Sequence, residues 1–193
     1  MRVVAGAARG RRLVAPKGLD VRPTTDRVKE AMFSSLQPLL PDARVLDLFA
    51  GAGGLGIEAL SRGAASVTFV ERARPALDAL RRNLDTVGLP GAEVVGVDVA
   101  RALRGPLPGA PFDLVLADPP YRLPADELEA LLATLVDHLA AGATVVVERD
   151  RRDGPPSWPL RLLGDEPRRY GDTALHRATL QAPDADGSVR RQP

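Results

Sequence analysis

Residues Arg44-Val-Leu-Asp-Leu-Phe-Ala-Gly-Ala-Gly-Gly-Leu-Gly56 decide the fold of this chain. The first six are mostly bulky and apolar, which is typical of a buried strand, and the glycines that follow can form a tight turn into a helix. The helix begins near Ile57 and ends at Gly63. Strand, glycine turn and helix together form the repeating unit of an open α/β sheet.

The alternation of strand and helix continues along the rest of the chain. Helical patterns occupy 75–87 and 126–139, and a short helical or irregular stretch occupies 99–104. Strands are expected at 44–49, 66–71, 92–97, 112–117, 143–148, 160–170 and 173–181. We predict a doubly wound, seven-stranded, mostly parallel sheet, in which the first five strands are parallel and the last pair includes an antiparallel strand.

The composition limits the classes of function. The chain has 193 residues, of which 45% are hydrophobic and 26% charged, enough for one globular domain. The absence of cysteine excludes disulfides, thiolate metal sites and a cysteine nucleophile, and two widely separated histidines argue against zinc. We expect no metal. No apolar run reaches membrane length and the N-terminus is a poor signal peptide, so we expect a cytoplasmic protein with no membrane partner.

Charge is distributed unevenly between the N-terminal leader and the body. Residues 1–29 carry a net charge of +6, and the remainder carries −5. This indicates a polyanionic partner reached through the leader, although a solvated charge run is the plainer alternative. Segments 2–5 and 11–16 read as a β-hairpin that must dock on the body or on the partner. We divide the chain into a hairpin extension (1–20), a main domain (21–181) and a flexible tail (182–193).

The strand predicted at 112–117 runs directly into Asp118-Pro-Pro-Tyr121. Pro119 and Pro120 have no N–H and a fixed φ, so the strand must stop there. The carboxyl ends of strands are where ligands bind in such sheets. The Asp118 carboxylate and the Pro119 carbonyl can both accept hydrogen bonds from one amino group, while Tyr121 stacks on the ring that carries it. An ordinary strand-to-loop turn is the alternative.

The glycines Gly51, Gly53 and Gly56 match the dinucleotide-binding fingerprint, with Glu71 at the next strand end to hold ribose hydroxyls. Any nucleoside cofactor that crosses this strand needs the same close approach to the backbone. Asp47, just before the glycines, would repel a pyrophosphate and suits a cationic group such as that of S-adenosylmethionine. Asp98 ends the third strand and can accept from an adenine amino group, or act only as a cap.

Residues 22–30, Arg-Pro-Thr-Thr-Asp-Arg-Val-Lys-Glu, precede the first strand of the body. Thr24 or Thr25 is a good helix N-cap, and Asp26 is favourable in the first turn. A helix start of this kind can hold a carboxylate, although a plain capped helix explains the pattern as well.

Taken in order, these motifs resemble those of the RsmD-type 16S rRNA guanine-N2 methyltransferases, a family of class I S-adenosylmethionine-dependent enzymes. The resemblance covers about residues 1–180, and its most specific part is the segment at 22–27. It implies a Rossmann-like fold and the methylation of the exocyclic N2 of a guanine in 16S rRNA. The implied partner is that RNA within an assembled or assembling small ribosomal subunit, bound by a monomer.

The resemblance also implies residue roles. The target guanine would be held by Asp118, Pro119, Pro120 and Tyr121. S-adenosylmethionine would be held by Thr24, Thr25, Arg27, Asp47, Phe49, Gly51, Gly53, Gly56, Glu71, Arg72, Asp98 and Val99. The RNA would be contacted by Arg9, Arg11, Arg12, Lys17 and Arg22. The loop departs mildly from the family pattern, because Ala52 replaces a common serine and Gly54 a common alanine.

Three other functions are compatible with parts of the pattern. An adenine-N6 methyltransferase acting on DNA or RNA would use the same Asp-Pro-Pro-Tyr motif, and only the leader and the overall resemblance favour guanine. An NAD-dependent oxidoreductase would need an acid/base set that the sequence does not show. A non-enzymatic RNA-binding protein would not need the motif positions that are all present here.

Overall fold

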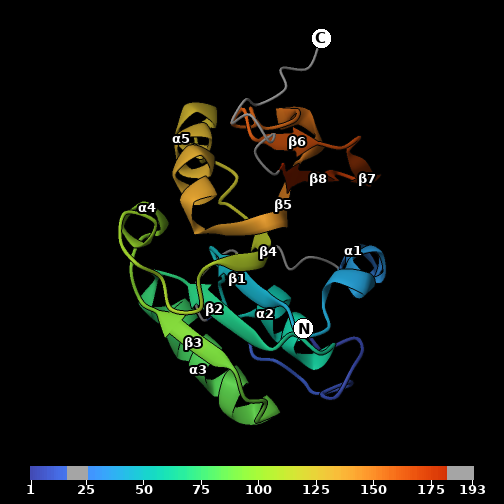
Figure 1. Ribbon diagram of the computed structural model, residues 1–193. Coiled ribbons are helices and arrows are strands. Elements are labelled where there is room, and N and C mark those ends of the chain that lie inside the picture. The colour runs from blue at the N-terminus through green and yellow to red at the C-terminus, as the bar shows by residue number, and fades with distance from the viewer. Residues whose placement is uncertain (17–25, 182–193) are drawn as a thin grey trace.

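The computed structural model describes residues 1–16 and 26–181, with residues 26 and 27 described by their backbone alone. One sheet runs through the molecule in the order β3-β2-β1-β4-β5-β8-β6, and β7 pairs separately with β8 (Figure 1). The strands are β1 Arg44–Leu48, β2 Ser66–Val70, β3 Ala92–Val95, β4 Phe112–Ala117, β5 Leu139–Asp150, β6 Leu162–Gly164, β7 Arg168–Tyr170 and β8 Thr173–Leu180. The first five strands are mutually parallel, and β8 is antiparallel to β5.

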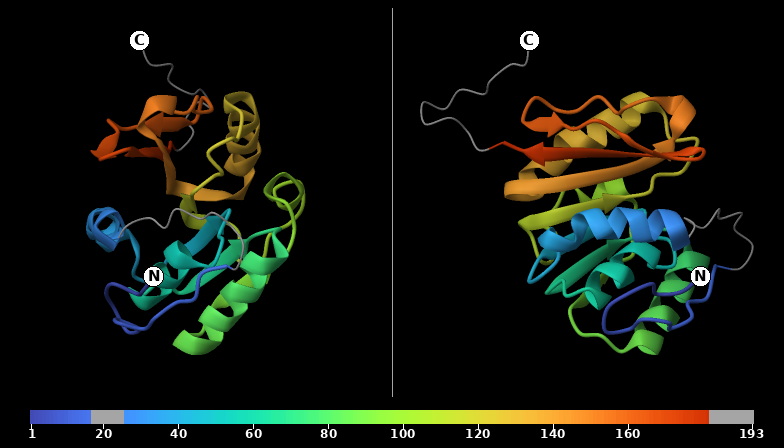
Figure 2. Two further views of the ribbon diagram at one scale, coloured as in Figure 1. Left: turned by 180° about the vertical axis from the view of Figure 1, so that it is seen from behind. Right: turned by 90° about the vertical axis from the view of Figure 1, so that its right-hand side faces the viewer.

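Helices cover both faces of this sheet (Figure 2). The α-helices are α1 Asp26–Leu36, α2 Gly54–Ser61, α3 Arg74–Val87, α4 Val99–Ala102 and α5 Ala125–Leu135, with single 3₁₀ turns η1 Gln37–Leu39, η2 Val136–His138 and η3 Arg151–Asp153. Buried side chains of α1, α2 and α3 form one apolar cluster, and those of α4 and α5 form a second. Because a strand buried on both faces is apolar throughout, the near-continuous apolar runs of β1 and β4 follow from this position.

The strand order reverses between β1 and β4. The chain passes from β1 outward to β2 and β3, and then returns to the other side of β1 with β4 and β5. Leu48 at the end of β1 pairs with Ala117 at the end of β4, so the two strands stop at the same level. The loops that follow β1 and β4 must diverge toward opposite faces there, and this opens a crevice at the carboxyl edge of the sheet.

The predicted doubly wound, mostly parallel sheet is confirmed, and several element boundaries differ from the expected ones; the strand predicted at 143–148, for example, extends over Leu139–Asp150. The segment 160–170, predicted as one strand, forms β6 and β7, because Pro167 cannot donate to a ladder; the sheet therefore has eight strands. The helix predicted to end at Leu139 ends at Leu135, since Leu139 begins β5 and pairs with Phe112. The strand predicted at 92–97 ends at Val95.

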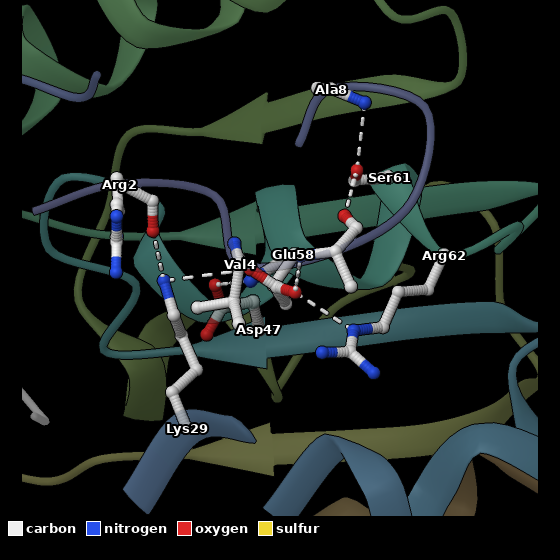
Figure 3. Close-up of polar contacts among 10 residues, drawn as sticks. Arg2, Val4, Ala8, Lys29, Asp47, Glu58, Ser61 and Arg62 are labelled. Carbon is white, nitrogen blue, oxygen red and sulfur yellow. Dashed lines mark hydrogen bonds and ion pairs between the residues drawn. The ribbon is translucent and has the colours of Figure 1, made fainter. Parts of the chain in front are cut away.

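Residues 1–16, here called the N-terminal strap, form a loop with a single antiparallel bridge between Arg2 and Arg12. The predicted hairpin is shorter than expected: beside this bridge, backbone hydrogen bonds join Val3 to Gly10 and Arg11, and Met1 to Leu13. Beyond them, side chains of α2 take up backbone groups that a partner strand would have used. Glu58 of α2 accepts from the N–H groups of Val4 and Ala5, at 2.8 and 3.0 Å (Figure 3). The strap therefore docks on the body, as expected, and packs Val3, Ala8 and Leu13 into the core.

Two further contacts fix the strap on α2. The Ser61 hydroxyl accepts from the Ala8 N–H at 2.9 Å and donates to the Ala5 carbonyl at 2.5 Å (Figure 3). Gly6 has φ +81°, and a Cβ built there would lie 1.7 Å from the Ser61 carbonyl oxygen. Only glycine allows this approach, so the strap passes against the end of α2 with no side chain between them.

Candidate active site

A groove lies at the carboxyl edge of the sheet where the strand order reverses. Its volume is about 340 Å³, which is in the range of small-molecule sites. Ten residues that the sequence singled out line it: Phe49, Gly51, Glu71, Arg72, Asp98, Val99, Asp118, Pro119, Pro120 and Tyr121. The structure thus brings the glycine loop and the Asp-Pro-Pro-Tyr segment, almost seventy residues apart in sequence, to one continuous surface.

The glycine loop, residues 50–54, forms one wall of the groove. Phe49 and Gly51 both have φ +57°, and Gly53 has φ +83°. A left-handed backbone is strained for phenylalanine, and such strain is typical of functional sites. A Cβ on Gly51 would meet only the Phe49 carbonyl oxygen, at 4.0 Å, so space remains over this glycine for a ligand.

Gly53 and Gly56 are required for packing, which the sequence analysis did not predict. A Cβ on Gly53 would lie 2.4 Å from a Leu80 methyl carbon, and one on Gly56 would lie 2.3 Å from the Phe69 ring. These glycines allow α2 to pack closely on β2 and α3. Neither glycine is among the residues that line the groove, and both affect the loop through the packing of the helix that follows it.

Asp47 lies under the loop and is also absent from the groove wall. Its side chain is buried, and its carboxylate accepts from the Gly56 N–H at 2.8 Å. Burial raises the pKa of Asp47 to about 7, helped by repulsion from Glu71, while the hydrogen bond from Gly56 opposes the shift. In this structure Asp47 fixes the start of α2 relative to β1.

Glu71 directly follows β2 and binds backbone groups around the groove. One carboxylate oxygen accepts from the Gly51 N–H at 2.9 Å, and the other accepts from the Arg72 and Ala73 N–H groups, both at 2.7 Å. The carboxylate is thereby held rigidly at the groove wall. Since a carboxylate has about four acceptor positions, it can still accept from a ligand hydroxyl.

Asp98 and Arg72 form the outer end of the groove. One Asp98 oxygen caps α4 by accepting from the Ala100 N–H at 2.9 Å, and the other lies 3.0 Å from a terminal nitrogen of Arg72. Asp98 is therefore a helix cap that also lines the groove, and its contact with an adenine amino group stays a prediction. The ion pair with Arg72 is exposed and contributes little stability.

Asp118 follows the last residue of β4, beside the end of β5. Ala117 pairs with Val147, so Asp118 and Glu148 are the next residues of two adjacent parallel strands. Burial raises the pKa of Asp118 well above its usual range, and repulsion from Glu148 and then from Asp47 raises it further. A carboxylate whose pKa is shifted by burial and by neighbouring like charges is typical of functional sites.

Glu148 is a site residue that the sequence reasoning missed. It is buried, and it lines a small hollow next to the groove together with Asp118, the two prolines and Tyr121. The sequence could have indicated Glu148, because the strand predicted at 143–148 ends on this carboxylate. Tyr121 itself is 57% exposed and lines both hollows.

The other predicted site residues fall into two groups. Arg9, Arg11 and Arg12 lie exposed on the strap. Thr24, Thr25, Lys17 and Arg22 lie outside the described residues, and Arg27 is described only as part of the backbone of α1. Pro16, at the end of the strap, lines the groove and was not predicted to do so.

Comparison with known proteins identifies the family of this fold and site. Residues 1–178 match the family described as Conserved hypothetical protein 95. The chain belongs to this family. It is 40% identical over 161 residues to ribosomal RNA small subunit methyltransferase D of Escherichia coli strain K12, covering 82% of this chain and 79% of that protein. It is 41% identical over 180 residues to YlbH of Bacillus subtilis strain 168, provisionally named an rRNA methyltransferase, covering 91% and 96%.

Solved structures agree with this membership. The structure of yhhF from Escherichia coli, which carries a provisional methyltransferase assignment, superposes with a TM-score of 0.82 at 36% identity. The superposition covers 94% of this chain and 98% of that one. The expected membership in the RsmD family and the methyltransferase class of the enzyme are therefore confirmed. Among the residues that the structure describes, no helix is both long and apolar enough to cross a bilayer.

Proposed function

We propose that this protein transfers a methyl group from S-adenosylmethionine to the exocyclic N2 of a guanine in 16S rRNA. One observation supports the proposal above the others: a single groove joins the glycine loop to Asp118-Pro-Pro-Tyr121. In-line transfer requires the methyl donor and the amino acceptor to share one cavity, and two separate hollows would not allow it.

The residues around the groove fit this cofactor. Glu71 holds an acceptor at the end of β2 for ribose hydroxyls, and Asp98 offers one for an adenine amino group. The open space over Gly51 allows the amino-acid end of the cofactor to approach the backbone. The groove also contains no cluster of cations among its described lining residues that would suit a pyrophosphate better. When bound, S-adenosylmethionine supplies a methyl group that is already activated by the sulfonium.

The protein's main task is then to position and polarise the amino group. The guanine N2 lone pair is delocalised into the ring, so the amine is a weak nucleophile. Hydrogen bonds to the Asp118 carboxylate and the Pro119 carbonyl localise this lone pair toward the methyl group, and they stabilise the positive charge that develops on nitrogen. Tyr121 stacks on the base and holds its plane. After transfer the nitrogen loses one proton, either to Asp118 or to water.

The exposed arginines of the strap are evidence for an RNA substrate. Arg9, Arg11 and Arg12, three of its four arginines, are exposed, while the strap backbone is fixed on α2. A rigid segment that presents several guanidinium groups is suited to phosphate contacts. We infer that the RNA lies across the strap toward the groove. We further propose that the substrate is the assembling or assembled small subunit, and that the protein acts as a monomer in the cytoplasm.

The proposal is tested with small-subunit particles from a strain that lacks the corresponding gene. The particles are incubated with the protein and S-adenosylmethionine labelled in its methyl group, and the RNA is then digested and its nucleosides separated. We expect label in N2-methylguanosine and none with the Asp118→Ala variant. Label in N6-methyladenosine would establish the alternative adenine specificity, and label in neither nucleoside would contradict the proposal.

A further inference from the structure

The N-terminal strap and the glycine loop are joined by one side chain, Asn83 of α3. Its amide nitrogen donates to the Ala52 carbonyl at 2.9 Å and to the Val14 carbonyl at 3.0 Å. Its amide oxygen accepts from the Val14 N–H at 2.8 Å. The residue is only 1% exposed, so these bonds form where water cannot replace them.

The glycine loop depends on such tethers because it has almost no side chains of its own to pack. Residues 50–54 are Ala-Gly-Ala-Gly-Gly, and a segment of this composition loses much conformational freedom when it is ordered. Its backbone is held from β2 by Val70 and Glu71, through the N–H groups of Ala50 and Gly51. Asn83 supplies the tether from the opposite side, on the residue between the two left-handed glycines.

The strap also forms hydrogen bonds with the Asn83 side chain. It is fixed to α2 through Glu58 and Ser61, and it then passes Asn83 at Val14 with a hydrogen bond to each backbone group of that residue. Two residues later, Pro16 lines the groove. The strap, Asn83 and the glycine loop therefore form one hydrogen-bonded path from the exposed arginines to the groove.

We propose that Asn83 is a positioning residue through which the docked strap holds the glycine loop in its cofactor-binding form. Asn83 does not line the groove, so we infer that it acts on the loop through its hydrogen bond to Ala52. Loosening the strap should then weaken cofactor binding, even though the strap arginines lie elsewhere. The inference rests on the proposed function, because it assumes that the groove binds S-adenosylmethionine.

The test measures the affinity of the full chain for S-adenosylmethionine by calorimetry. Asn83→Leu removes all three hydrogen bonds at similar volume, and Asn83→Asp keeps an acceptor for the Val14 N–H but loses the donor to Ala52. We expect each to raise the dissociation constant about tenfold, the loss expected for one buried hydrogen bond. The KM for S-adenosylmethionine should rise in parallel, while kcat at saturation changes less than about twofold.

Val87→Ala is the matched control for altered packing. Val87 is buried one helical turn after Asn83 on the same helix, and it is not among the residues that line the groove. This variant should lose thermal stability without changing cofactor affinity. If Asn83→Asp and Asn83→Leu bind the cofactor as tightly as the unmodified protein, Asn83 has no positioning role. If the unmodified protein does not bind it at all, the proposed function itself fails.

The contribution of the strap is tested by a double-mutant cycle. Ser61→Ala removes a strap contact at the opposite end of α2 from the loop, and we expect it to raise the dissociation constant about threefold in the unmodified protein. In the Asn83→Leu background the same change should have no further effect, because the path is already broken. An equal effect in both backgrounds, or none in either, would show that the strap does not act through Asn83.

Discussion

At the scale of single residues, Asp118 carries the chemistry that we propose. It sits where β4 ends, and burial together with Glu148 raises its pKa well above the usual range. The ionised form is needed to accept from the amino group and to stabilise the developing positive charge. We therefore expect changes at this residue to lower turnover, and changes at the opposite end of the groove to lower cofactor affinity.

We expect Asp118→Asn to reduce turnover about a hundredfold or more, because an amide is a weaker acceptor and offers no negative charge to the developing cation. Affinity for S-adenosylmethionine should stay within about twofold. Single-turnover methylation and calorimetry measure the two quantities separately. Equal losses in both would contradict the separation of roles between the two ends of the groove.

The raised pKa of Asp118 predicts a pH-dependent rate. As the pH rises through this pKa, the carboxylate ionises and turnover increases, so the acid limb of the profile lies at a higher pH than for an ordinary aspartate. Glu148→Gln removes the repulsion between the two carboxylates and should move this limb to lower pH. A profile of kcat against pH for both proteins measures the shift. A limb that stays in place would mean that Glu148 does not influence the reactive group.

At the scale of elements, the turn from β1 into α2 determines the geometry of the groove. Its glycines have different roles. Gly51 leaves room for a ligand, whereas Gly53 and Gly56 allow α2 to pack closely on α3 and β2. The sequence motif shows only that glycines are required, and it does not distinguish these tasks. Substitution of each glycine should therefore give a different result.

Gly56→Ala should destabilise the protein by about 1–3 kcal/mol, because the added Cβ would lie 2.3 Å from the Phe69 ring and force the core to shift. The free energy of unfolding in urea measures the effect. Gly105→Ala is the control, since nothing lies within 4 Å of a Cβ at that position and its φ is not left-handed. Equal stability of the two variants would show that the packing of α2 on β2 tolerates the methyl group.

At the scale of the whole molecule, the basic strap lies on an acidic body. The strap is fixed on α2 and α3 by buried hydrogen bonds, and its end reaches the groove through Pro16. A segment that is fixed in this way can present its arginines in a defined position relative to the active site. The described part of the positive leader, residues 1–16, therefore docks on the body, which was one of the two outcomes expected from the sequence.

Replacing Arg9, Arg11 and Arg12 together by alanine should weaken binding to 16S rRNA and reduce its dependence on salt. Each lost phosphate contact lowers the slope of log affinity against log salt by about 0.7–0.9, so three lost contacts lower it by about 2. Binding titrations at several salt concentrations measure this slope. Cofactor affinity serves as the control and should not change. An unaltered slope would remove the strap from the RNA contact surface.

The sequence by itself determined the class of fold and the two ends of the groove. Apolar runs that alternate with helical patterns define a doubly wound sheet, and Pro119 and Pro120 end β4 through their covalent structure alone. The same logic located Glu71, Asp98 and Asp118, because a carboxylate at the end of a buried strand is visible as a local pattern.

Only the tertiary structure decided which of these residues line the groove. Asp47 and Gly56 belong to the motif but lie beneath the loop, and Glu148 joins the site only because β5 pairs beside β4. The hydrogen bonds of Asn83 join residues 14, 52 and 83, which no local pattern could connect. Such contacts depend on packing between elements that are distant in sequence, whereas the patterns that can be read along the chain record only the local preferences of the backbone and the side chains.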